Sequence, residues 1–202
     1  MGNTNKAQTN NAKYGGVVYE YNIPDLDETK LKDEYKIVFI GESGTGTKTS
    51  LINRIKGVEF EEGIESSTGS LFFNIKVKLG ENRETKLQLY DTAGKEKYRE
   101  ITKAFLRDID GVVIGYDINN RKSYDEAISY WYPLIKNEFN TRIIYLLGNK
   151  MDLYKEDGSI TDEALNFAKS ENIGFYAISC KTDESILDFF DDLVYNLVKQ
   201  EN

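Results

Sequence analysis

Residues 41–49 combine glycine, lysine and threonine at a spacing that can bind phosphate. Their sequence is Gly-Glu-Ser-Gly-Thr-Gly-Thr-Lys-Thr, and it follows an apolar run. A glycine-rich turn before a helix can point backbone N–H groups at a phosphate, and the helix dipole favours its negative charge. A lysine followed by a hydroxyl residue, here Lys48 and Thr49, can reach the terminal phosphates and bind Mg²⁺. The candidate phosphate-binding residues are Glu42, Ser43, Gly44, Thr45, Gly46, Thr47, Lys48, Thr49 and Ser50.

Three later segments carry residues that can complete a nucleotide site. They are Asp-Thr-Ala-Gly at 91–94, Asn-Lys-Met-Asp at 149–152 and Ser-Cys-Lys at 179–181, each at the end of an apolar run. A carboxylate such as that of Asp152 accepts hydrogen bonds only, which suits the two adjacent donors of guanine and not adenine. Each segment alone is a weak signal. Their order and intervals together describe a guanine-nucleotide site.

With these four segments the chain resembles the Ras superfamily of small GTPases and, within it, the Rab family. The resemblance runs from about residue 35 to the C-terminus, and residues 86–90, 97–102 and 116–118 favour Rab over other branches. The resemblance implies a molecular switch of vesicle trafficking and protein transport. It also implies that this switch binds GTP or GDP with Mg²⁺ and hydrolyses GTP to GDP and phosphate.

The phosphate loop departs from the family pattern in length and in one residue. The motif places its lysine six positions after its first glycine, whereas Lys48 stands seven positions after Gly41, and Thr47 replaces a family glycine. In one alignment the loop has an extra residue and Lys48 keeps its role; in the other, Thr47 occupies the place of the lysine. We favour the first, because Phe60 follows Lys48 by twelve residues, where the family has an aromatic residue that packs on the base.

The resemblance also implies a set of magnesium ligands. Thr49 and Asp91 match the phosphate-loop hydroxyl and the aspartate that acts indirectly, and Ser67 matches the threonine of the first switch. Thr68 would serve instead if that loop slipped by one residue. Hydroxyl and carboxylate oxygens are hard ligands of the kind that Mg²⁺ requires. A solvated turn at residues 66–69 is an equally good interpretation of the sequence.

The catalytic residues implied by the resemblance are Lys48, Gly94 and Lys95. The Gly94 N–H would meet the γ-phosphate, and Lys95 stands where the family has the glutamine that orients the attacking water. An ammonium only donates hydrogen bonds, whereas that task needs a group that donates and accepts. We therefore predict slow hydrolysis and a weaker response to a partner's arginine finger.

Base recognition is the better preserved half of the predicted site. In the resembling family the aspartate binds guanine, the lysine stem packs over the base, and the backbone of the last segment binds the guanine O6. The base-binding residues implied are Phe60, Asn149, Lys150, Asp152, Ser179, Cys180 and Lys181.

The resemblance implies effector proteins, an exchange factor and a GTPase-activating protein as partners. Rab proteins present three aromatic residues to effectors, which by spacing are Phe72, Tyr90 and Phe105 here. Ordinary packing of these side chains is the alternative. The net charge of −8 and the pI near 4.8 argue against sequence-independent nucleic-acid binding, which relies on basic patches. We expect a monomer.

Apolar runs that alternate with amphipathic segments predict an α/β fold with a mostly parallel sheet of six strands flanked by helices, as in a small GTPase G domain of the P-loop NTPase type. The expected strands are residues 35–40, 71–79, 86–90, 111–116, 142–147 and 174–178, and the expected helices are 49–55, 123–137, 161–171 and 184–200. We expect the G domain at residues 35–202 and a flexible extension at residues 1–34, which are polar.

The sequence predicts a cytoplasmic protein that can associate peripherally with endomembranes. Its apolar runs are short of the roughly 18 residues of a membrane span. The single cysteine, Cys180, suits a reducing compartment. The last residues, 197–202, contain no cysteine for prenylation, and Lys6 weakens the N-myristoylation signal of Gly2.

Two other functions remain open at this stage. A pseudo-GTPase, which binds nucleotide weakly or not at all and serves as an interaction module, is favoured by Thr47, the longer loop and Lys95. An adenine-nucleotide enzyme of the wider P-loop class is disfavoured by Asp152.

Overall fold

The computed structural model describes residues 18–60, 71–80, 83–92, 99–139, 141–154 and 159–201. Within these residues, seven strands form one sheet in the order β1-β3-β4-β2-β5-β6-β7. The strands are β1 Val18–Tyr21, β2 Glu34–Gly41, β3 Leu71–Leu79, β4 Arg83–Asp91, β5 Gly111–Asp117, β6 Ile143–Asn149 and β7 Gly174–Ala177. Only β3 and β4 pair antiparallel; every other neighbouring pair is parallel.

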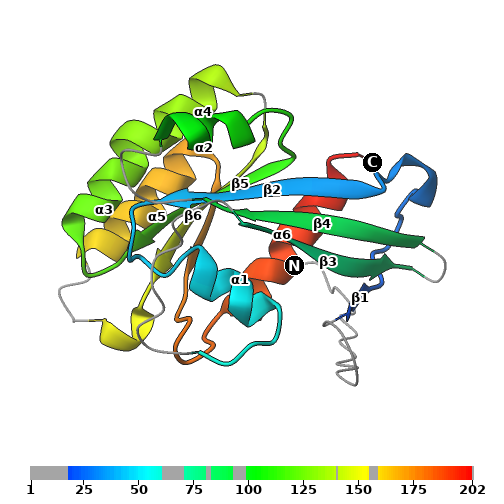
Figure 1. Cartoon of the computed structure of the whole chain (residues 1–202), viewed down its shortest axis with the longest axis horizontal. Helices are drawn as coiled ribbons and strands as arrows, with labels where there is room; N and C mark the ends of the chain where they lie inside the picture. Colours follow the sequence, from blue (N-terminus) through cyan, green and yellow to red (C-terminus); the bar gives the residue numbers. More distant parts are fainter. Residues whose placement is uncertain are drawn as a thin grey trace.

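Helices cover both faces of this sheet (Figure 1). The helices are α1 Thr49–Ile55, α2 Arg99–Phe105, α3 Arg121–Glu126, α4 Tyr132–Glu138, α5 Ser159–Glu171 and α6 Ile186–Lys199, with short turns at η1 Glu28–Lys30, η3 Ala127–Trp131 and η4 Met151–Leu153. One apolar cluster joins the sheet to α1 and α6, and a second joins it to α3, η3, α4 and α5. The interior strand β5 is buried along its whole length, as its nearly continuous apolar sequence predicts for a parallel strand between two helical layers.

The α/β fold predicted from the sequence is confirmed, and most predicted elements lie within a few residues of the observed ones. Strand β3 and helix α1 have the expected bounds. The helix expected at 123–137 is α3 and α4 joined by the wider π-helical turn η3. Helix α2 was not predicted, and the sheet has seven strands within the described residues rather than six.

The extra strand comes from the segment that was expected to be a flexible extension. β1 pairs in parallel with the end of β3, from Val18 opposite Lys76 to Tyr21 opposite Leu79. Three apolar side chains of this segment, Tyr19, Ile23 and Leu31, are at most 7% exposed and belong to the α1–α6 cluster. Residues 18–34 therefore pack onto the sheet and helices instead of forming a flexible extension, because a few well-spaced apolar side chains fix this otherwise polar segment. Residues 1–17 lie outside the described part.

Two tyrosine hydroxyls attach β1 to the helices beneath it. Tyr19 donates to the carbonyl of Ile55, the last residue of α1, at 2.7 Å. Tyr21 donates to the Asp191 carboxylate of α6 at 2.8 Å. The carbonyls at a helix C-terminus have no partner within the helix, so the Tyr19 contact satisfies one such group at the end of α1.

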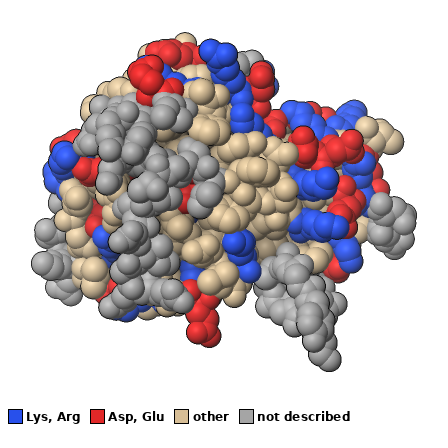
Figure 2. Space-filling model, viewed as in Figure 1, with Lys and Arg blue, Asp and Glu red and all other residues tan. Residues whose placement is uncertain are grey.

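The solvent face of the β1–β3–β4 part of the sheet carries paired charges. Lys78 contacts Glu20 at 2.6 Å and Lys76 contacts Glu84 at 3.1 Å. Figure 2 shows positive and negative side chains interspersed at this end of the molecule. Such a surface suits solvent contact and protects a sheet edge from unwanted pairing. None of the described helices is long and apolar enough to span a lipid bilayer.

Candidate functional site

The predicted site residues gather at the carboxyl edge of the parallel strands. β2 ends at Gly41, β4 at Asp91, β5 at Asp117 and β6 at Asn149. The strand register places Gly41 opposite Gly115, and Asp117 opposite Asn149. In open α/β sheets ligands bind outside this edge, where loops from neighbouring strands meet.

The Lys48 ammonium lies inside the glycine-rich loop. Its Nζ donates to the carbonyls of Gly41 at 3.0 Å and of Glu42 at 2.8 Å, and the residue is 7% exposed. Gly44 and Gly46 adopt φ values of 81° and 73°, which favour glycine. Burial is the main cause that lowers the pKa of Lys48 to about 8, against the opposing effect of Asp91. The loop therefore holds a cation that would gain from a nearby phosphate.

The added bulk of Thr47 is directed away from this cation and into the sheet. Thr47 is 1% exposed, and its hydroxyl shares a 2.8 Å hydrogen bond with that of Thr45. A Cβ atom on Gly115 of β5 would lie 1.8 Å from the Thr47 Oγ1. The missing side chain at Gly115 thus provides the space that Thr47 occupies. Of the two residues considered for the phosphate-binding lysine position, Lys48 is the one whose side chain contacts the loop carbonyls.

Thr49 and Asp91, two of the three expected metal ligands, are in direct contact. The Thr49 hydroxyl, in the first residue of α1, donates to Asp91 Oδ2 at 2.6 Å, and Asp91 is fully buried. A buried carboxylate beside a hydroxyl is a donor set of the hard type that suits Mg²⁺. The other residues expected here, Ser67 or Thr68, Gly94 and Lys95, lie outside the described residues.

Asn149 connects the phosphate loop to the predicted segment at residues 179–181. Its amide Nδ2 donates to the carbonyl of Thr45 at 2.9 Å, and its Oδ1 accepts from the backbone N–H of Cys180 at 3.0 Å. The residue is 3% exposed. The Cys180 thiol also approaches the Gly46 carbonyl at 3.5 Å. One side chain therefore sets the relative position of two loops that are far apart in the sequence.

Asp152 lies beside Ser179. The Ser179 hydroxyl donates to Asp152 Oδ1 at 2.6 Å and accepts from the Thr182 N–H at 3.1 Å. This arrangement orients the carboxylate that was predicted to bind guanine. Burial raises the pKa of the Cys180 thiol to about 12, so this cysteine is a neutral packing residue at physiological pH.

The remaining predicted residues are placed less centrally. Phe60 packs partly buried against the α1–α6 cluster. The Lys181 side chain is exposed, and Ser43 and Ser50 are half-buried at the loop and the start of α1. The Glu42 carboxylate, largely buried, pairs with Lys122 of α3 at 2.8 Å. That ion pair was not predicted from the sequence.

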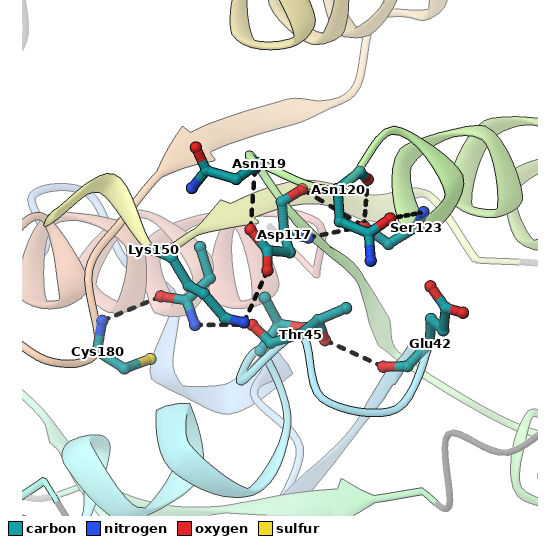
Figure 3. Close-up of polar contacts among 10 residues, drawn as sticks. Glu42, Thr45, Asp117, Asn119, Asn120, Ser123, Lys150 and Cys180 are labelled. Atoms are coloured by element: carbon teal, nitrogen blue, oxygen red, sulfur yellow. Dashed lines mark hydrogen bonds and ion pairs between the residues drawn. The ribbon is translucent and has the colours of Figure 1, made fainter. Parts of the chain in front are cut away.

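A polar group at the end of β5 was also missed. Asp117 pairs with Lys150 at 2.7 Å, and Asn119, Asn120 and Ser123 surround it (Figure 3). Residues 116–118 had been noted only as a mark of family resemblance. The available signal was that Asp117 directly follows the apolar run of residues 111–116, as Asn149 follows that of residues 143–148.

The three predicted effector-facing aromatic residues form one cluster. Phe72 stacks on Tyr90 with ring centroids 5.7 Å apart, and Phe105 lies 5.8 Å from Tyr90. Phe72 is 57% exposed, whereas the other two are half-buried. An exposed aromatic ring supported by two others is a frequent anchor of protein interfaces.

Comparison with known proteins agrees with this architecture. A Ras family model matches residues 36–199. The chain therefore belongs to the Ras family of small GTPases, and it is most similar to the Rab proteins.

Several curated relatives carry Rab or GTP-binding names. The chain is 36% identical over 153 residues to Ras-related protein Rab-1 of Theileria annulata, which covers 75% of this chain and 69% of the relative. It is 31% identical to Ras-related protein Rab-18 of Lymnaea stagnalis, in an alignment that covers 86% of this chain and 85% of the relative. It is 33% identical to GTP-binding protein ypt3 of Schizosaccharomyces pombe, in an alignment that covers 83% of this chain and 79% of the relative.

Proposed function

We propose that this protein is a guanine-nucleotide switch of the Rab type, which binds GDP and GTP at the carboxyl edge of its sheet. The observation that carries the proposal is the Lys48 ammonium, buried within a glycine-rich loop whose Thr45 carbonyl is fixed by Asn149. The loop, Lys48 and the start of α1 bind the phosphates, and Asp152 with the 179–181 loop selects guanine. The relatives' printed names, such as GTP-binding protein ypt3, agree with this assignment.

Mg²⁺ would be bound at Thr49 and Asp91, with Ser67 or Thr68 as a further oxygen ligand when GTP is present. The contact between the Thr49 hydroxyl and the Asp91 carboxylate supports this position. When bound, the ion would neutralise part of the phosphate charge. Lys48 supplies a second positive charge next to the loop.

GTP hydrolysis is proposed to be slow. Lys95 replaces the glutamine that would orient the attacking water, and an ammonium cannot accept the hydrogen bond that this task needs. Lys48 and the Gly94 N–H would still stabilise charge on the transferred phosphoryl group. The protein would therefore remain in its GTP-bound state longer than relatives that keep the glutamine.

The switch is proposed to act in vesicle trafficking through partners that distinguish its nucleotide states. Phe72, Tyr90 and Phe105 form the proposed effector contact, and an exchange factor and a GTPase-activating protein would control the nucleotide. The proposed location is the cytoplasm, with peripheral association with endomembranes, and the proposed state is a monomer.

Calorimetric titration of the nucleotide-free protein tests the proposal. We expect tight, Mg²⁺-dependent binding of GDP and GTP, weak binding of ADP, and a loss of at least about a hundredfold in affinity in Lys48→Ala, since a charge-assisted contact to phosphate contributes about 3 kcal/mol. Lys78→Ala, which removes an exposed cation that pairs with Glu20 outside the site, is the control and should change affinity little.

The titration also distinguishes the nucleotide switch from the second candidate function. A pseudo-GTPase is favoured by Thr47 and the longer loop, and it would give no measurable GDP binding or binding that is indifferent to Lys48→Ala. Multiple-turnover hydrolysis at the rate of ordinary Rab proteins would contradict the role given to Lys95.

A further inference from the structure

Asp117 contacts a residue of the proposed base site although it lies outside the four predicted nucleotide-binding segments. It is the last residue of β5, directly opposite Asn149 in the parallel register. Its Oδ2 lies 2.7 Å from the Nζ of Lys150, and its Oδ1 accepts from the Asn119 N–H at 2.9 Å. Both carboxylate oxygens are therefore engaged, one of them by the lysine that follows Asn149.

The pair is sheltered from solvent on the aspartate side. The Asp117 side chain is 13% exposed and that of Lys150 is 34% exposed. An ion pair in a partly buried position is screened less than one on the surface, so it restrains the lysine more strongly. Lys150 also has the left-handed backbone conformation, with φ of 75° and ψ of 39°, which few residues other than glycine adopt. Backbone and side chain of Lys150 are thus both constrained.

The start of α3 fixes Asp117 in turn. The Ser123 hydroxyl accepts from the Asp117 N–H at 3.0 Å and donates to the Asn120 carbonyl at 2.7 Å (Figure 3). The Asn120 side chain accepts from the Ser123 N–H at 3.2 Å and so caps the helix. The β5 backbone and the start of α3 therefore both fix the position of Asp117, independently of its contact with Lys150.

We propose that Asp117 is a positioning residue for guanine binding, which holds the Lys150 side chain where its aliphatic stem packs over the base. The inference rests on the proposed function, because it takes Lys150 as a base-contacting residue. Asp117 itself would not touch the nucleotide. Without its carboxylate the long lysine side chain samples several rotamers, and part of the binding free energy is lost in ordering it again.

A double-mutant cycle on GDP affinity tests whether Asp117 acts through Lys150. Asp117→Asn keeps the size of the side chain and the acceptor for Asn119, but removes the charge that Lys150 needs. We expect the Kd for GDP to rise about tenfold in Asp117→Asn and to change by less than about twofold when the same substitution is made in Lys150→Ala. Asp125→Asn, an identical change in an exposed ion pair of α3 with Arg121, is the matched control and should leave the Kd unchanged.

A purely structural role would give a different result. If Asp117→Asn weakened GDP binding by the same factor with and without the Lys150 side chain, the positioning role would be wrong. Thermal unfolding of each nucleotide-free variant shows whether the fold is retained, and Ser123→Ala gives a second variant that loosens Asp117 without changing its charge. Failure of the wild-type protein to bind GDP would overturn the proposed function as well, whereas equal factors overturn the positioning role alone.

Discussion

The carboxyl edge of the sheet and its β1 edge are built by different physical means. At the carboxyl edge, polar side chains bind the backbone of neighbouring loops, as Asn149 binds Thr45 and Cys180. At the β1 edge, a short segment is attached mainly by apolar burial, through side chains such as Leu31. Variants of the first region should therefore alter nucleotide binding more than stability, and variants of the second should do the opposite.

The largest stability effect is expected from Leu31→Ala at the β1 edge. Leu31 is 6% exposed and packs in the α1–α6 cluster, so truncation should lower the free energy of unfolding by about 2–4 kcal/mol. Chemical denaturation measures this loss. The Kd for GDP should stay within about twofold of the wild-type value, and a larger change would show that the two edges are coupled.

Gly115→Ala tests the point at which the phosphate loop meets the core. The new methyl group would clash with Thr47, so we expect a loss of about 1–3 kcal/mol in unfolding free energy together with weaker GDP binding. The double variant Gly115→Ala, Thr47→Gly should recover much of both losses, because it removes the atoms that clash. A double variant as defective as Gly115→Ala alone would disprove the claim that Gly115 makes room for Thr47.

The pH dependence of GDP binding tests the charge state of Lys48. Its pKa in the ligand-free protein is lowered to about 8, and a bound phosphate favours the protonated form. Binding must therefore take up a proton above pH 8, and the Kd should rise by up to about tenfold per pH unit there, while below pH 8 this effect disappears. Titrations at pH 8.5 in buffers of different ionisation enthalpy measure the uptake. Zero uptake would contradict the prediction.

Raising the pH weakens GDP binding through Lys48, but it has the opposite effect on the stability of the ligand-free protein. The unfolded chain keeps the Lys48 proton up to its ordinary pKa of 10.5, whereas the folded protein releases it near 8. Between these values the unfolded state binds more protons, so this residue makes the unfolding free energy rise with pH. Lys48→Met should remove that contribution.

The smallest effects are expected from the two tyrosine hydroxyls of β1. Tyr19→Phe should cost about 1 kcal/mol, because its acceptor is a neutral carbonyl, and Tyr21→Phe about 2 kcal/mol, because its acceptor is the Asp191 carboxylate. Chemical denaturation again gives both values. Because Tyr19 contacts the end of α1 and Tyr21 does not, faster GDP release in Tyr19→Phe alone would break the separation between the two edges.

The sequence predicted the fold class and most of the elements because both depend on local patterns. Continuous apolar runs such as residues 111–116 identify strands buried on both faces. The amphipathic pattern of residues 184–200 identifies the helix observed at Ile186–Lys199. Helix α2 was missed because its seven residues show no clear period and no motif marks their start, whereas the equally short α1 follows the glycine-rich loop that predicts it.

Burial of the N-terminal segment could not be predicted from its composition. Residues 18–34 are largely polar, and the few apolar ones become informative only once β3, α1 and α6 form the surface that receives them. Pairing between β1 and β3 joins residues almost sixty positions apart, and no local pattern specifies such a pair.

By itself, the sequence determined the chemistry that we predict for this protein: a lysine to bind phosphate, oxygen ligands for Mg²⁺, and an aspartate matched to guanine. These are properties of residue type and spacing. Only the tertiary structure decided where the additional bulk of Thr47 goes, that Asn149 joins two loops and that Asp117 holds Lys150. The physical reason is that each depends on atoms brought together from separate strands, which the fold alone places within contact distance.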